Sequence, residues 1–345
     1  MGGTRFADPP RGSDLERVNM KKRAFVLAGA MLFGALSWFG CGKKSGEITV
    51  YMPDGAPALA LAKLMHEDTE SDGVSYRVVD VRTDARALIS KVTNEDPNVN
   101  ADLCVLPISA AAQKLGSGET YKMVGLVTQG NLYLVSKNAT VYDKSNVQAL
   151  NGKLIVVNKL TDVPGLTLKA ALRRNGLEWV LHEGGEIVED KVHLIGQASE
   201  YDLELVAEPA VSARMAKGYH IAGNLQELYA RSAAEDGSYP QAVLVAKTSI
   251  VEQKRAWLQS FLGKVAVAED WLYTAAAEEI YAAVSSHYVD SGKQPVFTEA
   301  VLTTATIARC GISFAYAKDC QNAVEEYLTE VGCALPSSAF YWAQN

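Results

Sequence analysis

The chain has 345 residues, of which 48% are hydrophobic and 21% charged, and its formal net charge is −7. This length is ample for two lobes with separate hydrophobic cores. The acidic balance, without any basic run interleaved with aromatic residues, argues against a nucleic-acid-binding protein, because that class needs a positively charged surface.

The N-terminal segment has the order of a bacterial secretion signal. The basic cluster 21–23 precedes an apolar run, 24–39, and Gly40-Cys41 follows. The run is short for a helix that crosses a ~30 Å hydrocarbon core, and a small residue before the cut is typical of a cleaved signal. We therefore predict an upstream leader and signal peptide over 1–40, with lipidation of Cys41 at the start of a linker over 41–47. An uncleaved anchor and a plain signal peptide are the alternatives, and cleavage before Cys41 would leave a net charge of about −10.

The first half of the mature chain alternates strand and helix patterns. Runs rich in β-branched and other apolar residues predict strands at 48–52, 76–79, 102–106 and 123–127. Apolar residues at helical spacing predict helices at 57–66, 84–92 and 109–115. The run 102–106 is almost entirely apolar, which is typical of a strand that is covered on both faces of its sheet.

A second alternating series follows. It predicts strands at 131–135, 154–157, 192–195 and 204–207, with helices at 164–175 and 209–215. After a late strand at 241–246, the remainder predicts helices at 250–273, 278–286, 298–307 and 317–331. Two alternating series joined by a bridging strand indicate two α/β lobes.

Cysteine spacing gives no sign of a metal site. The five cysteines form no C-x-x-C pair, and no histidine lies at zinc-site spacing from them, so we predict no metal. Cys104 lies within an apolar run and is expected to be a buried strand residue. An exported protein can form disulfides, and Cys310 and Cys320 are the preferred pair because they flank a short segment that could fold back on itself. Reduced thiols at Cys310, Cys320 and Cys333 are the alternative.

Enzyme motifs are missing from the sequence. It contains no phosphate-binding G-x-x-x-x-G-K-[ST] loop, no H-E-x-x-H, no G-x-S-x-G and no G-x-G-x-x-G. The five histidines are scattered, and the acidic pairs lie on predicted helices, where a solvent-facing role is expected. We therefore predict a protein that is not an enzyme and uses no cofactor.

Four loops at strand ends stand out instead. They are 53–56, 107–109, 161–167 and 208–210, and the last three open a predicted helix. Ligands of open α/β sheets bind beyond the carboxyl ends of the strands, and helix N-termini present free N–H groups there. Each loop taken alone could equally be an ordinary capped turn.

Several of these segments together resemble a known family. The segments are 48–64 (ITVYMPDGAPALALAKL), 102–109 (DLCVLPIS), 150–177 (LNGKLIVVNKLTDVPGLTLKAALRRNGL) and 206–209 (VAEP). They resemble the solute-binding proteins of ABC importers for nitrate, sulfonates and thiamine precursors, in an order that covers nearly all of 48–331.

The resemblance implies an α/β fold of the type II periplasmic-binding-protein, or Venus-flytrap, class with two crossing hinge strands. Lobe 1 would comprise 48–130 and 247–345, and lobe 2 would comprise 131–246, with crossings near 131–136 and 241–246. Such a receptor would be exported and anchored to the outer face of the cell membrane by its lipid, or periplasmic, and its partners would be ABC permease and ATPase subunits. An enzyme of the thiamine-pyrimidine synthase type and a sensory lipoprotein are the alternatives on the same scaffold.

The expected ligand site lies between the lobes. The predicted contacts are Asp54, Gly55, Ala56, Pro107, Ile108, Ser109, Thr161, Gly165, Thr167 and Glu208, with Gln129 and Asn131 as wall residues at the first crossing. The carboxylates of Asp54 and Glu208 favour a ligand with hydrogen-bond donors, such as a vitamin-precursor heterocycle. Asp162 could cap the helix beside it and occupy donors that a bare anion would use. A small organic anion stays open as the other ligand class.

Overall fold

The computed structural model describes residues 47–68, 73–81, 86–231, 237–290 and 292–344. The predicted leader, Cys41 and linker residues 42–46 lie outside these ranges. Within them, no helix combines the length and the apolar character needed to cross a membrane.

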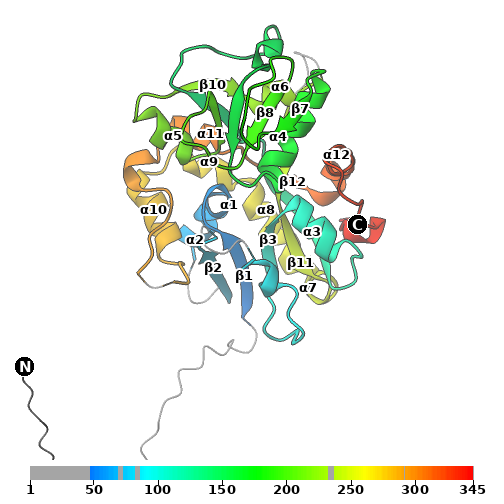
Figure 1. Cartoon of the computed structure of the whole chain (residues 1–345). Coiled ribbons are helices and arrows are strands. Elements are labelled where there is room, and N and C mark those ends of the chain that lie inside the picture. The colour runs from blue at the N-terminus through cyan, green and yellow to red at the C-terminus, as the bar shows by residue number, and fades with distance from the viewer. Residues whose placement is uncertain (1–46, 69–72, 82–85, 232–236, 291, 345) are drawn as a thin grey trace, which may run out of the picture. The chain divides into compact units, whose positions relative to one another are not determined.

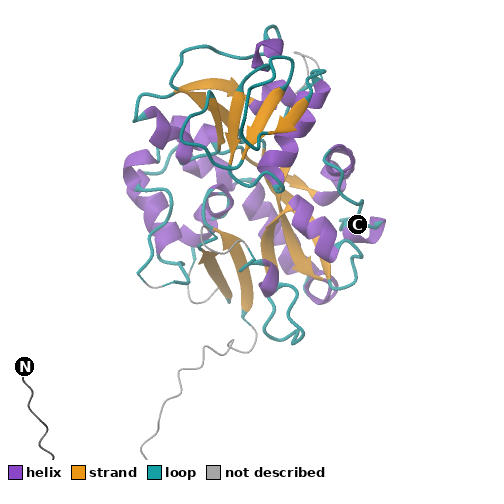
Figure 2. Cartoon of the chain, in the orientation of Figure 1, coloured by secondary structure: helices purple, strands orange, loops and turns teal. Residues whose placement is uncertain are grey.

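Two six-stranded sheets organise the described chain (Figures 1 and 2). The first has the order β12-β4-β11-β3-β1-β2. Its strands are β1 (Ile48–Pro53), β2 (Val74–Val79), β3 (Leu103–Pro107), β4 (Tyr121–Gln129), β11 (Pro240–Lys247) and β12 (Ile312–Tyr316). β1 is parallel to β2 and β3, whereas β11 is antiparallel to β3 and β4, and β12 is antiparallel to β4. We call this sheet with its helices the first lobe.

The second sheet has the order β10-β5-β9-β6-β8-β7. Its strands are β5 (Tyr133–Ser136), β6 (Leu154–Val157), β7 (Trp179–Leu181), β8 (Val192–Ile195), β9 (Leu203–Val206) and β10 (His220–Asn224). With α4 (Val163–Arg174), α5 (Ala210–Met215), α6 (Leu225–Tyr229) and the 3-10 turn η2 (Val147–Leu150) it forms the second lobe. This mixed α/β architecture of two sheets confirms the fold class predicted from the alternating patterns.

Helices cover both faces of the first sheet. The helices of the first lobe are α1 (Ala56–Leu59), α2 (Ala62–His66), α3 (Ile108–Leu115), α7 (Thr248–Gln253), α8 (Arg255–Ala266), α9 (Ala268–Leu272), α10 (Ala277–Ser285), α11 (Thr304–Arg309) and α12 (Ala317–Glu330), with 3-10 turns η1 (Ile89–Lys91), η3 (Glu299–Val301) and η4 (Ser338–Phe340). Successive side chains of a strand point to opposite faces. Leu103 and Val105 accordingly belong to the core with α1, α2 and α8–α11, while Cys104 and Leu106 belong to the core with α3 and α12.

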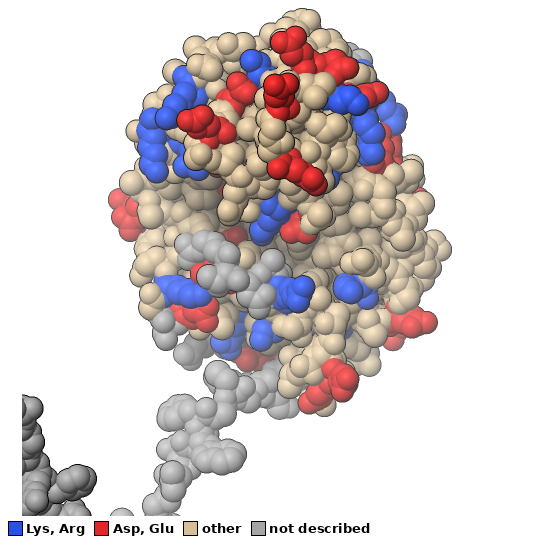
Figure 3. All heavy atoms as spheres, viewed as in Figure 1, with Lys and Arg blue, Asp and Glu red and all other residues tan. Residues whose placement is uncertain are grey.

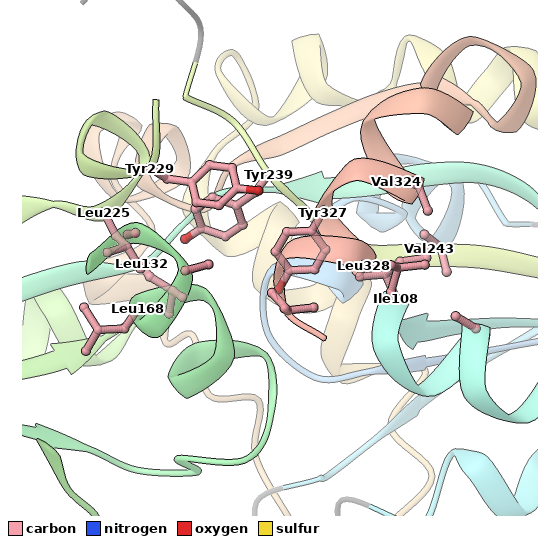
Figure 4. Close-up of a cluster of buried hydrophobic side chains, with 14 of the residues drawn as sticks. Ile108, Leu132, Leu168, Leu225, Tyr229, Tyr239, Val243, Val324, Tyr327 and Leu328 are labelled. Carbon is pink, nitrogen blue, oxygen red and sulfur yellow. The ribbon is translucent and has the colours of Figure 1, made fainter. Parts of the chain in front are cut away.

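The core beside α3 and α12 continues into the second lobe (Figure 4). Tyr239, just before β11, stacks on Tyr327 of α12 with ring centroids 6.0 Å apart, and it meets Tyr229 of α6 edge-on at 5.3 Å. Leu168 of α4 and Ile108 of α3 lie on either side of these rings. One continuous apolar cluster therefore joins the two lobes.

The chain passes between the lobes twice. It leaves the first sheet after Gln129 and enters the second at Tyr133, and it returns between Tyr229 and Pro240. The predicted crossings near 131–136 and 241–246 overlap β5 and β11, which follow these two passages. That the passages act as hinges stays a prediction.

Three parts of the C-terminal region differ from the predicted elements. The helix expected at 298–307 is observed as the 3-10 turn η3 (Glu299–Val301) followed by α11 (Thr304–Arg309). The single helix expected at 250–273 is divided into α7, α8 and α9, because Lys254 and Val267 leave the helical backbone region, with ψ angles of 34° and 8°. The segment after Cys310 forms β12, a strand that the apolar pattern does not reveal. Gly311 (φ 60°) makes this possible, since its carbonyl accepts the Gln129 amide at 2.7 Å and a Cβ there would lie 2.6 Å from backbone oxygens.

The predicted disulfide between Cys310 and Cys320 is not formed in the structure. Both side chains are buried free thiols. Cys310 belongs to the core on the α8–α11 side of the first sheet, and Cys320 belongs to the core on the α12 side. The sheet therefore separates two cysteines that are close in sequence.

Candidate functional site

A cavity of about 470 Å³ lies between the two lobes. Its walls come from loops after β1, β2, β3 and β6 and from the starts of α3 and α4. The lining residues are Pro53, Val81, Arg86, Leu88, Ile89, Leu106, Pro107, Ser109, Ala110, Lys159, Asp162, Val163 and Pro164. We call this space the interlobe cavity. It lies beyond the carboxyl ends of parallel strands, where open α/β sheets bind ligands.

The start of α3 forms part of the first-lobe wall. Pro107 is the N-cap in extended conformation, so the helix begins at Ile108, one residue before the predicted cap Ser109. The side chain of Pro107 provides no capping hydrogen bond to the first turn. The first N–H groups of a helix have no intrahelical partner, and they carry the positive end of its dipole. Ser109 and Ala110 bring this end of α3 to the cavity.

The start of α4 faces the same cavity from the second lobe. Asp162 is its N-cap in extended conformation, but the carboxylate makes no capping hydrogen bond. The expectation that Asp162 occupies the donors of this helix is therefore wrong. Pro164 has no N–H to offer, which leaves Val163 and Gly165 as donors in the first turn.

The loop between β6 and α4 is held in an unusual conformation. Lys159 has φ 74°, the one positive φ outside glycine among the described residues. Glycine at position 165 lets α4 approach the loop backbone closely, because a Cβ there would lie 2.2 Å from the carbonyl oxygen of Leu160. Lys169 donates to that same oxygen at 3.1 Å, and burial, with Arg173 nearby, lowers the pKa of its ammonium group. Backbone strain that surrounding contacts hold in place is frequent at functional sites.

The interlobe cavity is apolar with charged groups at its edge. Aliphatic surface comes from Val81, Leu88, Ile89 and Leu106. Two cations, Arg86 and Lys159, and the carboxylate of Asp162 add the charges. Basic and acidic groups also meet at the boundary of the lobes in Figure 3. Ligand pockets are commonly apolar with a few placed polar groups. This arrangement suits a small molecule with an apolar body and an acidic group.

Three of the four predicted loops contribute to the wall of the interlobe cavity, and 107–109 and 161–167 contribute the most residues. From 107–109, Pro107 and Ser109 are in the wall, while Ile108 points into the shared core and is fully buried. From 161–167, the residues that line the cavity are Asp162, Val163 and Pro164. The predicted contacts Thr161, Gly165 and Thr167 do not line it. Thr161 is exposed, and Thr167 is buried and bonded to Tyr327.

The loop at 53–56 contributes Pro53 alone. Asp54 turns away, and its Oδ2 accepts hydrogen bonds from Tyr288 Oη at 2.6 Å and from the Val296 amide at 2.8 Å. Asp54 and Gly55 instead border a cavity of about 10 Å³ beside α10. Ala56 is buried in the core around α1. The structure therefore gives Asp54 a role in joining β1 to the segment after α10, and it places neither Gly55 nor Ala56 at the interlobe cavity.

The predicted wall residues at the first crossing bond to the segment around β12. Gln129 Nε2 donates to Ser313 Oγ at 3.2 Å, and Asn131 Nδ2 donates to the Cys310 carbonyl at 3.2 Å. Neither residue lines the interlobe cavity.

Glu208, the predicted contact of the fourth loop, is bound by protein groups. Arg309 Nε lies 2.6 Å from Glu208 Oε1, and Ser212 donates to both carboxylate oxygens. The Glu208 carboxylate is therefore an interlobe ion-pair partner in this structure. Tyr133 lies near this pair, and burial is the largest cause of its raised pKa.

The sequence patterns miss Lys159 and Arg86 at the interlobe cavity. Lys159 is the second residue after β6. This position at a strand end is the sequence feature that could have identified it as a site residue. They also miss the loop after β8, which borders a second hollow, of about 500 Å³, on the second lobe. That hollow is lined by Val156, Gln197, Ala198, Ser199, Tyr201, Glu204 and Arg214.

No group of three or more histidine, cysteine or carboxylate side chains is placed to hold a metal ion within the described ranges. His182 and His193, which lie eleven residues apart in the sequence, meet with their Nδ1 atoms 3.3 Å apart. Both ring nitrogens of His193 are engaged, since its Nε2 contacts the backbone of Val188. The pair anchors the loop between β7 and β8.

No family model matches the sequence, and no curated protein matches it either. Solved structures do resemble it. An ABC transporter from Parabacteroides distasonis is 19% identical with a TM-score of 0.63, over 87% of this chain and 100% of that chain. The periplasmic aliphatic sulphonate-binding protein SsuA from Escherichia coli is 14% identical with a TM-score of 0.56, over 85% and 95%. The alkanesulfonate-binding protein SsuA from Xanthomonas axonopodis pv. citri, bound to MOPS, is 14% identical with a TM-score of 0.54, over 86% and 98%.

At these identities the likeness concerns the fold. The described fold, with its two six-stranded sheets, superposes on these neighbours over nearly their whole length. The chain therefore has the two-lobed α/β fold of the periplasmic solute-binding proteins.

Proposed function

We propose that the chain is an extracytoplasmic receptor that captures a small solute between its lobes and delivers it to an ABC importer. One observation carries the proposal. Loops from both lobes, including the starts of α3 and α4, converge on one largely apolar cavity of about 470 Å³. A cavity that both lobes line can couple ligand binding to the spacing of the lobes.

The ligand that suits this cavity is a small organic anion with an apolar body. Lys159 is cationic, and two helix starts without side-chain caps supply N–H groups. Asp54 and Glu208, which favoured an amine-bearing heterocycle, bond to protein groups outside the cavity. An organic sulfonate or carboxylate therefore fits the charges better than a vitamin-precursor heterocycle does.

The proposed partners are the permease and ATPase subunits of an importer. Export and lipid anchoring at Cys41 on the outer face of the membrane belong to the same proposal, on the strength of the basic-apolar-cysteine order at the N-terminus. A sensory lipoprotein would use the same cavity but would need no importer. An enzyme on this scaffold would need a reactive group, and the lining residues include no histidine or cysteine.

Native mass spectrometry of the purified protein, with a search for a co-purified small anion, tests the proposed ligand. Calorimetry with the identified compound should give one site per chain. A ligand that carries a net positive charge would contradict the proposed chemistry. Loss of uptake in cells that lack the protein would separate transport from sensing.

Ligand should also bring the lobes together. Small-angle scattering is expected to give a smaller radius of gyration at saturating ligand, because such receptors close by rotating nearly rigid lobes. A radius that does not change would contradict closure.

A further inference from the structure

One buried ion pair spans the two lobes at α5 and α11. Glu208 follows β9 in the second lobe, and Arg309 is the last residue of α11 in the first. The Arg309 Nε and Glu208 Oε1 atoms lie 2.6 Å apart, and the side chains are 19% and 1% exposed. Removal of one partner from such a pair leaves the other charge buried without compensation.

A network of hydroxyl groups surrounds the pair and also crosses between the lobes. Ser212 of α5 donates through its Oγ to Glu208 Oε1 at 3.0 Å and through its amide to Oε2 at 3.1 Å. Arg309 Nη2 donates to the same Ser212 Oγ at 3.2 Å, and Thr306 Oγ1 of α11 lies 3.2 Å from it. Glu208 and Ser212 belong to one lobe, and Thr306 and Arg309 belong to the other. We call these four residues the interlobe polar cluster.

A second contact between the lobes combines apolar and polar groups. At α12 the lobes share the aromatic cluster of Tyr229, Tyr239 and Tyr327. Arg174 of α4 also pairs there with Glu330 of α12, with Nη2 and Oε1 2.6 Å apart. Figure 1 shows α12 on the opposite side of the described fold from α5 and α11. Parting the lobes at α12 would expose apolar surface to water, which is unfavourable. Parting them at the interlobe polar cluster would exchange its hydrogen bonds for bonds to water, so the net cost there depends on how well water replaces these partners.

We infer that Glu208 and Arg309 are positioning residues that hold the lobes at the spacing seen in the structure before any ligand binds. The pair would thereby raise the population of this arrangement, and a ligand that needs it binds more tightly when it is more populated. This role concerns the empty protein, so it holds or fails independently of the ligand proposed above.

The test is the radius of gyration of the ligand-free protein, measured by small-angle scattering on the wild type, Glu208→Gln and Arg309→Gln. Both variants should be larger than the wild type, and Arg309→Lys, which keeps a cation, should restore much of the compact form. The matched control is Glu204→Gln. It removes the ion pair with Arg214 (Nε to Oε2 2.5 Å), whose two residues both lie in the second lobe, so it should leave the radius unchanged.

Far-UV circular dichroism identifies variants that fail to fold. Should both glutamine variants unfold, Ser212→Ala replaces them, because it removes hydrogen bonds to both charged residues but leaves the charges in place. A smaller increase in radius is expected for it. The inference is overturned if folded variants keep the wild-type radius, or if the wild-type scattering curve already departs from the lobe spacing seen in the structure.

Discussion

The hydroxyl oxygens of Thr167 and Tyr327 lie 2.8 Å apart and join α4 of the second lobe to α12 of the first. The two side chains come from positions 160 residues apart, and both residues are almost completely buried, with exposures of 0% and 1%. Thr167 also bonds to the Val163 carbonyl at 2.6 Å. A residue that the sequence proposes for the ligand is thus part of the contact between the lobes.

Tyr327→Phe is expected to lower the free energy of unfolding by about 1 kcal/mol. The change removes one buried hydrogen bond and leaves the ring in the aromatic cluster, and a typical internal hydrogen bond contributes this much. Urea denaturation measures the loss. Tyr219→Phe is the control, because its hydroxyl pairs with Tyr201 at 3.2 Å within the second lobe. A Tyr327→Phe variant with wild-type stability but weaker ligand binding would instead favour a role of Thr167 in the site.

Lys159 offers a variant that separates stability from binding. Lys159→Gly should raise the unfolding free energy by about 1 kcal/mol, since glycine adopts a φ of 74° without steric cost. Lys159→Ala keeps the strain and should not be stabilised. Both variants should bind the co-purified anion about tenfold more weakly, because each loses a cation at the cavity.

The matched control is Lys217→Ala, which removes one positive charge from an exposed position after α5. Calorimetry and urea denaturation together give the two readouts. Unchanged affinity in both Lys159 variants would remove this residue from the proposed site.

Asp54→Ala should affect stability rather than binding. Besides Tyr288 and Val296, the carboxylate accepts the Gly55 amide at 2.7 Å, so its removal leaves several donors without their acceptor. A loss of about 2 kcal/mol or more is expected, because hydrogen bonds to a charged group are among the stronger ones. Glu252→Ala, an exposed carboxylate on α7, is the control. Wild-type stability with lost binding would return Asp54 to the ligand site.

Thiol reactivity tests the separation of Cys310 from Cys320. Burial raises the pKa of Cys310 to about 12 and of Cys320 to about 11, and it also raises the pKa of the less buried Cys333. A raised pKa lowers the thiolate fraction at pH 8, and thiolate is the reactive form. Iodoacetamide should therefore modify Cys333 in the native protein and spare the other two. In urea without reductant all three should react, whereas protection of Cys310 and Cys320 until reductant is added would indicate the disulfide.

Lipid attachment at Cys41 is tested in cells. A palmitate analogue should label the wild type and the Cys333→Ala variant but not Cys41→Ala. The expectation rests on the basic and apolar segments that precede Cys41. Equal labelling of all three proteins would rule this anchor out.

Most strands were predictable from sequence, because a strand that is covered on both faces of its sheet is a continuous run of apolar residues. The apolar run at 102–106 became β3 (Leu103–Pro107), one residue further on. Short strands such as β7 and β12 were missed, since β12 depends on the turn at Gly311 and on pairing with β4, which is far away in the sequence. Local residue patterns do not encode such partners.

The sequence predicted several of the loops that line the candidate site but not which side chains of those loops point into it. A carboxylate after a strand looks the same in sequence whether it faces a ligand or a distant partner. Asp54 has Tyr288 as its partner and Glu208 has Arg309, at separations of 234 and 101 residues. The positive φ of Lys159 depends on the packing of its loop rather than on its residue type. Side-chain direction was thus the information that the sequence did not contain.

The order of strands in the first sheet has a consequence for how the newly made chain folds. β4 lies between β11 and β12, and both of these neighbours follow the entire second lobe in sequence. The strands of the second lobe, by contrast, all come from the continuous stretch 133–224. Pairing between distant segments is slow, because the connecting chain must be ordered first. As the chain emerges, the second sheet can therefore assemble early, while one edge of β4 waits for β11 and the other waits for β12, about 70 residues later.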